Sequence, residues 1–177
     1  MKTTYQIDPA HSSVHFSVRH MMITNVRGAF KNIKGTVVYD PANLAETSVE
    51  ATIDAASIMT MDEQRDAHLR SADFLDVEKY PTITFKSKKV EPGKVTGDLT
   101  IHGVTQEVAL DVDGPTGETK DPFGNTRVGA SASTKIKRST FGLNWNAALE
   151  TGGILVGDEL KIELEVSMIK SEAKAAG

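Results

Sequence analysis

The chain has 177 residues, of which 39% are hydrophobic and 25% are charged, and its formal net charge is −4 at pH 7. This length and composition are typical of one globular domain with a substantial core, and the small acidic net charge argues against a general nucleic-acid-binding protein. The sequence contains no cysteine, which excludes disulfides, thiolate catalysis and zinc–thiolate sites.

The N-terminal stretch MKTTYQIDPAHSS contains one lysine and no apolar run of the length that a signal peptide requires. No other stretch approaches the length of a transmembrane helix. As written, the sequence predicts a cytoplasmic protein. A periplasmic protein whose export signal had been removed, with a methionine added in its place, would look the same.

Eight stretches alternate apolar and polar residues with the period of two that is typical of half-buried β-strands. They are Ser12–Met21, Val26–Asp40, Thr47–Ala56, Thr82–Val90, Lys94–His102, Thr105–Asp113, Thr126–Arg138 and Asp158–Ile169. Short connections predict antiparallel neighbours. Eight such strands close most economically into an up-and-down β-barrel, because closure removes the exposed edges. A two-sheet sandwich is the alternative. We expect one domain over residues 1–170 and a flexible polar tail over residues 171–177.

Between the third and fourth strands, residues 57–81 have the pattern of a short helical insert. Thr60 can cap a first helix and Ser71 a second one. Pro81 ends the insert, and period-two alternation resumes directly after it. An insert that leads straight into a strand predicts a lid on the barrel.

Charged residues crowd the first helix of this insert. A run of charges on a helix is most often a solvated face, and this is our interpretation for Arg65 and Asp66. Arg70 can instead attach the insert to the barrel through a buried ion pair with a nearby aspartate. We therefore expect the insert to be held in part by Arg70.

Several residues on the inward faces of the predicted strands are small. They are Ala51, Ala55, Gly97, Ala130, Ala132 and Thr134. An eight-stranded barrel is just wide enough to be filled by side chains or to hold one slim ligand. Because protein interiors are close-packed, a lining of small residues favours a bound ligand. The alternative is that Phe16, Phe30, Phe85 and the methionines fill the barrel from opposite walls.

The expected strand directions place the helical insert, the long loop 139–157 and two polar residues at the same mouth of the barrel. If the strands alternate up and down, the first, third, fifth and seventh end together, beside residues 22–25, the helical insert, the turn at Gly103 and the long loop 139–157. His20 and Arg138 are the last inward-facing residues of the first and seventh strands. We therefore expect both as polar groups at the rim of this mouth.

The sequence contains no pattern typical of catalysis or of a metal site. A nucleophile elbow and a phosphate-binding glycine loop are both absent, and the histidines lack the spacing of metal ligands. His20 ends an apolar face, where a lone histidine is most often a core residue bonded to a backbone carbonyl. Its second interpretation is a donor to a ligand's polar head, and a catalytic base is a weaker third. Trp145 is interpreted as a plug of the barrel mouth.

Several segments together resemble one family, the YceI-like polyisoprenoid-binding proteins. They are IDPAHSSVHFSVRH (7–20), VRGAF (26–30), RDAHLRSADFLDVEKYPTITFKS (65–87), GDLTIHGVT (97–105), DPFGNTRVGASASTKIKRSTFGLNWN (121–146) and GGILVGDELKIELE (152–165). The segments span nearly the whole chain and occur in order. The resemblance implies an extended, lipocalin-like, eight-stranded antiparallel barrel, a long isoprenoid chain in its tunnel, and no known catalysis. Many family members carry an export signal.

We therefore predict a protein that stores, sequesters or transports a long-chain isoprenoid lipid or an isoprenoid quinone without catalysis. The predicted tunnel lining is Phe16, Val18, Ala51, Ile53, Leu69, Phe74, Phe85, Leu99, Ala130, Ala132 and Trp145. The predicted polar rim, which would orient the ligand's head, is His20, His68 and Arg138. No catalytic residue, metal, cofactor or nucleic-acid partner is expected. A homodimer is compatible with the sequence.

Two other functions remain as alternatives. The first is a lipid-modifying hydrolase or isomerase that uses His20 or His68 as its base. The second is a stress-related interaction protein whose barrel is filled by its own side chains. The ligand's head group and chain length do not follow from the sequence.

Overall fold

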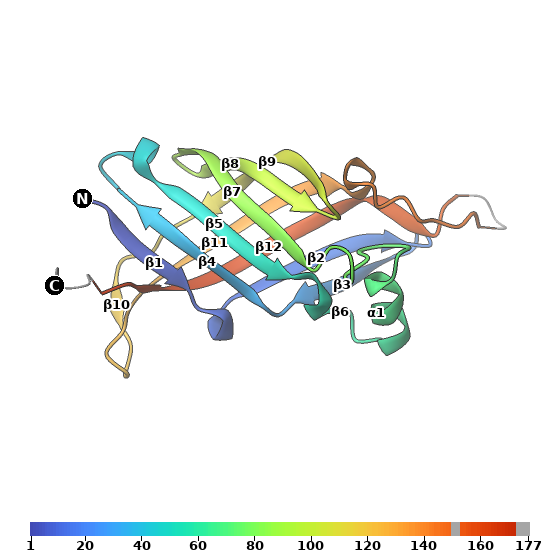
Figure 1. The fold of residues 1–177 in the computed structure, drawn as a ribbon, viewed down its shortest axis with the longest axis horizontal. Helices are drawn as coiled ribbons and strands as arrows, with labels where there is room; N and C mark the ends of the chain where they lie inside the picture. The colour runs from blue at the N-terminus through green and yellow to red at the C-terminus, as the bar shows by residue number, and fades with distance from the viewer. Residues whose placement is uncertain (150–152, 173–177) are drawn as a thin grey trace.

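The structure is a computed structural model that describes residues 1–149 and 153–172. It is an elongated barrel of antiparallel strands with one α-helix beside one end (Figure 1). The strands are β1 (Thr3–Ile7), β2 (Ser13–His20), β3 (Thr24–Phe30), β4 (Ile33–Tyr39), β5 (Ser48–Asp54), β6 (Ile58–Met59), β7 (Thr82–Glu91), β8 (Lys94–Ile101), β9 (Val104–Asp113), β10 (Thr119–Lys120), β11 (Thr126–Lys137) and β12 (Val156–Lys170). The helices are α1 (Glu63–Arg70) and the short 3-10 helices η1 (Pro9–His11), η2 (Leu44–Glu46), η3 (Ala55–Ser57) and η4 (Arg138–Phe141).

Strand β12 closes the barrel. It pairs with β11 along one edge and with β1 and β2 in turn along the other edge. From β12 the ring of strands runs through β1, β4, β5, β7, β8 and β9 to β11. The predicted fold class, a closed eight-stranded antiparallel barrel with a short helical insert between its third and fourth strands, is confirmed. The alternative of a two-sheet sandwich is wrong.

The first two barrel strands are each interrupted, which the alternation pattern did not predict. β1 lies before the first predicted strand and pairs with the end of β12, with Tyr5 opposite Lys170. Pro9 begins η1, and the chain then continues as β2 along the same edge of β12. Proline cannot donate a ladder hydrogen bond, so the edge is broken at this point. The predicted second strand is likewise divided into β3 and β4 around residues 31–32.

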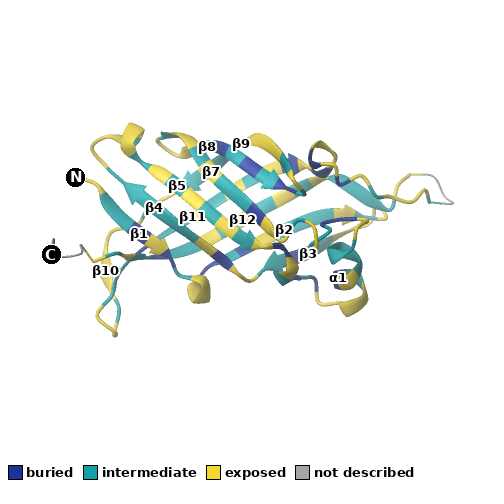
Figure 2. Cartoon of the chain, viewed as in Figure 1, coloured by how far each residue is buried: buried dark blue, intermediate teal, exposed yellow. Residues whose placement is uncertain are grey.

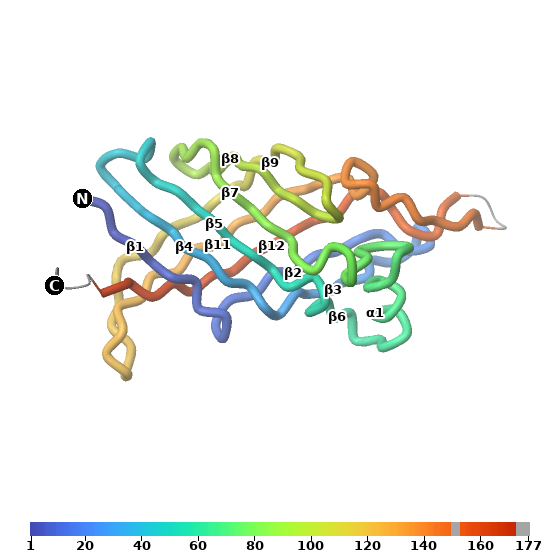
Figure 3. The backbone as a smooth tube through the Cα atoms, viewed as in Figure 1, coloured from blue at the N-terminus to red at the C-terminus, as the bar shows by residue number. Residues whose placement is uncertain are grey.

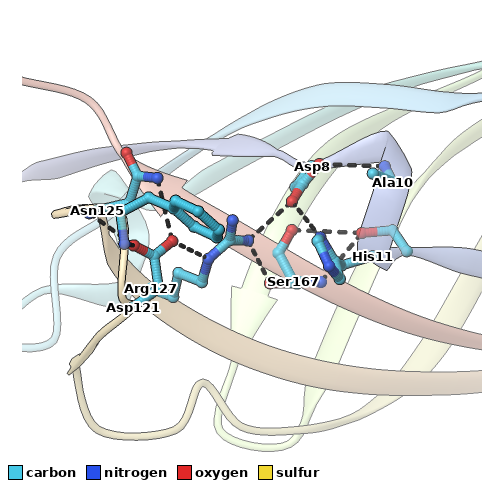
Figure 4. A network of polar contacts seen from close by, with 9 residues as sticks. Asp8, Ala10, His11, Asp121, Asn125, Arg127 and Ser167 are labelled. Atoms are coloured by element: carbon cyan, nitrogen blue, oxygen red, sulfur yellow. Dashed lines mark hydrogen bonds and ion pairs between the residues drawn. The ribbon is translucent and has the colours of Figure 1, made fainter.

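The interruption between β1 and β2 is tied to a distant loop by Arg127 (Figure 4). Arg127 Nε donates to Asp121 Oδ2 at 2.7 Å, and its Nη1 donates to Asp8 Oδ2 at 2.8 Å. Asp8 also caps η1, because its Oδ1 accepts from the N–H of Ala10 at 3.0 Å. The guanidinium of Arg127 holds the pKa of both carboxyl groups below the usual range.

The insert differs from its prediction at its first turn. Asp62, and not Thr60, caps α1 by accepting from the N–H of Arg65 at 3.0 Å. Asp66 is buried, and its Oδ1 accepts from the backbone N–H of Thr60 at 2.8 Å and from the Thr60 hydroxyl. The interpretation of Asp66 as part of a solvated face is therefore wrong, because its carboxylate organises the segment that precedes the helix.

The second half of the insert is a series of turns. The predicted second helix is absent from residues 71–80, where the N–H of Phe74 bonds to the carbonyl of Ser71 at 3.0 Å. Arg70 does hold the insert, but through backbone carbonyls: it donates to Ala56 O at 2.9 Å and to Ile58 O at 3.0 Å. The expected ion pair of Arg70 with an aspartate is wrong.

Buried residues recur along the strands (Figure 2) and form two hydrophobic clusters. The cluster nearer the insert consists of Ala55, Ile58, Leu75, Ile83, Leu99, Ile101, Ile136, Phe141 and Leu143. The other consists of Tyr5, Ile7, Val14, Ile33, Val128 and Met168. β2, β5, β8 and β11 all lead toward the mouth beside the insert, as the alternation of strand directions predicts.

Candidate ligand-binding cavity

A cavity of about 610 Å³ extends through the barrel interior. Residues of the eight strands in the ring line it, together with residues of the insert. Its lining is apolar almost throughout, and Glu91 and Arg138 are the two charged residues that border it within the described part of the chain. A space of this size and chemistry can hold a long apolar ligand, whereas water would gain few hydrogen bonds inside it.

The two ends of the cavity differ. At the insert end its lining includes the buried residues Ile58, Phe74 and Leu143, which close that end. At the opposite end the lining includes Pro92 and Gly93, which are exposed. The more open mouth therefore lies at the end without the insert, where η2 and the β7–β8 turn meet.

Most of the predicted tunnel lining borders this cavity. Phe16, Val18, Ala51, Ile53, Leu69, Phe74, Phe85, Leu99, Ala130 and Ala132 all line it. Phe16 and Phe30 contact each other with ring centroids 5.7 Å apart, so these rings narrow the barrel near β2 and β3 without filling it. Ala132 lies on β11 opposite Leu164 of β12, in the middle of the longest strand pair.

Trp145 does not border the cavity. Its ring packs edge-on against His68 with centroids 4.6 Å apart and lies 5.3 Å from the ring of Phe74. Phe74 is the member of this aromatic group that reaches the lining. Trp145 therefore holds the insert against the loop that follows η4.

The predicted polar rim is not assembled around the cavity. His20 lies at the end of β2 opposite Thr24 and does not border the cavity. His68 bonds through Nε2 to Asp73 Oδ2 at 2.9 Å, and it does not border the cavity either. Of the three predicted residues, the structure places Arg138 alone in the lining.

Arg138 is buried and binds backbone carbonyls. Its Nε donates to Gly157 O at 2.8 Å, its Nη1 to Leu143 O at 2.6 Å and to Trp145 O at 2.9 Å, and its Nη2 to Val156 O at 3.1 Å. Burial lowers the pKa of the guanidinium from its ordinary value, but an arginine stays protonated in proteins. Arg138 thus joins the start of β12 to the loop after η4 and places a cation at the closed end of the cavity.

Lining residues that the sequence prediction did not include come chiefly from the end without the insert. They include Tyr5, Val37, Tyr39, Val49, Glu91, Leu110, Val112 and Val166. The valines and leucines in this set could have been predicted as lining residues from the period-two alternation of their strands. Tyr5 lies on β1, a strand that the pattern did not predict. Burial and a hydrogen bond to Glu118 at 2.9 Å raise the pKa of Tyr5 to about 12.

Within residues 1–149 and 153–172, the structure places no three His, Cys, Asp or Glu side chains where they could hold a metal ion. In the same part of the chain, no helix has the length and apolar character needed to cross a membrane.

A family model described as the YceI-like domain matches residues 5–168. The chain belongs to the YceI-like family. A UPF0312 protein of Staphylococcus aureus is 39% identical to this YceI-like chain over 171 residues, which are 96% of this chain and 99% of the relative.

Solved structures agree with this membership. The crystal structure of Burkholderia cenocepacia BcnA has a TM-score of 0.76 and 30% identity to this YceI-like chain, over 91% of this chain and 98% of BcnA. The YCEI protein of Campylobacter jejuni has a TM-score of 0.69 and 35% identity, over 87% and 90% of the two chains. A polyisoprenoid binding domain from Saccharophagus degradans has a TM-score of 0.71 at 16% identity, over 96% and 99%, and so shares the fold.

Proposed function

We propose that this YceI-like protein binds a long-chain isoprenoid lipid or an isoprenoid quinone inside its barrel, and stores, sequesters or transports it without changing it chemically. The observation that carries the proposal is the cavity of about 610 Å³, where two of the described lining residues, Glu91 and Arg138, are charged. Its volume lies within the range of about 300–1,000 Å³ that is typical of ligand sites. The Saccharophagus degradans domain of the same fold is described as polyisoprenoid binding.

The apolar tail can supply the affinity by itself. At about 0.8 kcal/mol per buried CH₂ group, a buried stretch of about twenty carbons gives a gross gain of roughly 16 kcal/mol, which exceeds what nanomolar binding requires. Contacts with the head group are therefore unnecessary for tight binding. The length and shape of the cavity would set the selectivity for the chain.

A lipid-modifying enzyme has less support. A catalytic base must lie within hydrogen-bonding reach of the atom from which it takes a proton. His20 and His68, the two candidate bases, do not border the cavity, and His68 is bonded to Asp73. The geometry thus favours binding without turnover.

Organic-solvent extraction of the purified protein, followed by mass spectrometry, tests the proposal. We expect an isoprenoid-tailed lipid in an amount comparable to that of the protein. A second arm loads the delipidated protein with an isoprenoid quinone or a polyprenyl ester and recovers it after incubation. A protein that neither carries nor takes up such a lipid contradicts the binding proposal, whereas a recovered lipid of altered mass contradicts the absence of catalysis.

A further inference from the structure

Exposed apolar side chains gather where β2 turns into β3. Met21, Met22 and Ile23 form this turn and are 43%, 59% and 69% exposed. Ile154, which is 44% exposed, immediately precedes Leu155, whose carbonyl accepts from the N–H of Met21 at 2.7 Å. The β2–β3 turn and the segment that leads into β12 lie at the same end of the barrel (Figure 3). We call Met21, Met22, Ile23 and Ile154 the apolar tip. Single exposed apolar residues are ordinary, but a contiguous group of them marks an interaction site.

A group of cations lies on the outer surface of the sheet that carries this tip. Arg27 on β3 is opposite Ser17 on β2, Ser17 is opposite Lys161 on β12, and Lys161 is opposite Lys135 on β11. The row crosses four neighbouring strands. Arg19 and Lys137 lie on the same outer surface, closer to the mouth beside the insert. We call Arg19, Arg27, Lys135, Lys137 and Lys161 the basic face.

Glu159 and Glu163 flank Lys161 on the outer side of β12, but within the described residues neither carboxylate forms an ion pair with the basic face. Across the described residues, the ion pairs of the protein involve none of these five side chains. Glu159 lies opposite Lys137 in the ladder but forms no ion pair with it in that set. Lys135 and Lys161 are direct cross-strand neighbours, and like charges in that arrangement are destabilising.

The other side of the barrel is built differently. There Lys86 pairs with Glu50 at 3.7 Å, and Lys88 lies 3.3 Å from Asp98 and 3.6 Å from Glu107. These two lysines on β7 are thus matched by carboxylates on β5, β8 and β9. The chain as a whole has a net charge of −4, so the unmatched cations beside the apolar tip are a local feature and not a reflection of its composition.

We propose that the apolar tip and the basic face together dock the protein on the surface of an anionic phospholipid bilayer. The surface of such a bilayer has a layer of phosphate head groups above a layer of acyl chains. Apolar side chains can enter the acyl boundary while neighbouring Lys and Arg side chains remain among the phosphates. A nucleic acid would match the cations but would leave the tip exposed to water. This docking goes beyond the binding of a lipid in the barrel and does not require an occupied cavity.

Co-sedimentation with lipid vesicles tests the docking. The full chain is mixed with vesicles of phosphatidylcholine alone or with a large fraction of phosphatidylglycerol, at low and at high salt. We expect binding to the anionic vesicles, little binding to the neutral ones, and weaker binding as salt screens the charges. The double substitution Lys135→Gln and Lys161→Gln is expected to weaken binding by about 30-fold. Met22→Ser with Ile23→Ser is expected to weaken it at least about tenfold.

Matched controls exist on the same chain. Lys86→Gln with Lys88→Gln removes the same charge from the other side of the barrel, and Phe123→Ser removes an apolar side chain that is 87% exposed on a different loop. Neither control should change binding. The proposal would be overturned by equal binding to neutral and anionic vesicles, or by no binding to either. It would also be overturned if the test and control variants lost binding equally, or if the protein bound heparin but not vesicles. The amount of lipid that solvent extraction recovers from the tip variants measures occupancy of the cavity independently of docking. A loss of docking can therefore be distinguished from an empty cavity.

Discussion

Arg127 Nη1 lies 2.8 Å from the Oδ2 of Asp8, across a sequence separation of 119 residues. Asp8 stands where β1 ends and η1 begins, and Arg127 lies on β11. The ion pair therefore joins two segments that are distant in the sequence. It stabilises the break between β1 and β2, which divides the first barrel strand. A second carboxylate, that of Asp121, shares the same guanidinium at 2.7 Å.

This network predicts a dependence of stability on pH. Both aspartates have a folded-state pKa below the ordinary value of 3.8. They therefore contribute stability above about pH 4, and this contribution is lost as the pH falls through their folded-state pKa values. We expect Arg127→Met to lower the Tm at neutral pH, and the gap from the wild type to narrow as the pH falls below about 4. Thermal unfolding followed by circular dichroism measures this gap. A gap that is the same at all pH values would contradict the role of the carboxylates.

Gly97 on β8 lies against the backbone of β7. A Cβ at this position would overlap the carbonyl oxygen of Lys86 and would lie 2.8 Å from the Cα of Ser87. Because these are backbone atoms of a paired strand, they cannot move aside cheaply. We expect Gly97→Ala to lower the free energy of unfolding by about 1–3 kcal/mol, as measured by urea denaturation. Gly117→Ala is the control, since a Cβ there meets no atom within 4 Å, and equal effects of the two would show that the close approach is unimportant.

Ala132 tests whether the cavity holds the lipid. We expect Ala132→Trp to place an indole in the cavity and to remove most of the lipid that solvent extraction recovers. Ser133→Trp is the matched control, because Ser133 is the next residue and is exposed on the outer surface. Circular dichroism checks that both variants fold. Recovery of lipid from Ala132→Trp at the level of the wild type would place the ligand elsewhere.

Arg138 tests how the closed end is held. Arg138→Met would remove the guanidinium from four carbonyls, those of Gly157, Leu143, Trp145 and Val156, of which Val156 O keeps the Asn146 amide as a donor at 2.7 Å. Each buried group left unpaired costs about 1–3 kcal/mol, and some carbonyls would regain water. We expect a loss of about 2 kcal/mol or more in the free energy of unfolding.

Chemical denaturation measures this loss. Lys137→Met provides the control, because Lys137 is the preceding residue and is exposed. It should change stability by less than about 0.5 kcal/mol. A similarly small effect of Arg138→Met would mean that the loop after η4 does not depend on the guanidinium.

Much of the architecture could be predicted because it follows from local periodicity. Val108, Leu110 and Val112 alternate with the exposed residues Ala109, Asp111 and Asp113, and an antiparallel strand turns this alternation into one inner and one outer face. The small residues Ala130 and Ala132 predicted an unfilled interior, and both border the cavity. The direction of each strand then followed from the short connections.

Other features depend on partners that are distant in the sequence. β1 has five residues and becomes a strand by pairing with β4 and with the end of β12. Asp66 is an acidic residue on a helix, yet it is buried, because the packing of the insert brings Thr60 onto its carboxyl group. His68 and Trp145 were predicted to meet the ligand, but they meet each other outside the lining.

The amino-acid sequence alone determined the eight long alternating stretches, their inner and outer faces, and the small size of several inner side chains, since each of these depends on neighbours within a few residues. Tertiary structure alone decided which end of the barrel is closed, what Arg138 binds, and the gathering of Arg27, Lys135 and Lys161 into one row. The physical reason is register: closure of the ring sets which residues of distant strands stand opposite each other. No pattern within a single strand contains that information.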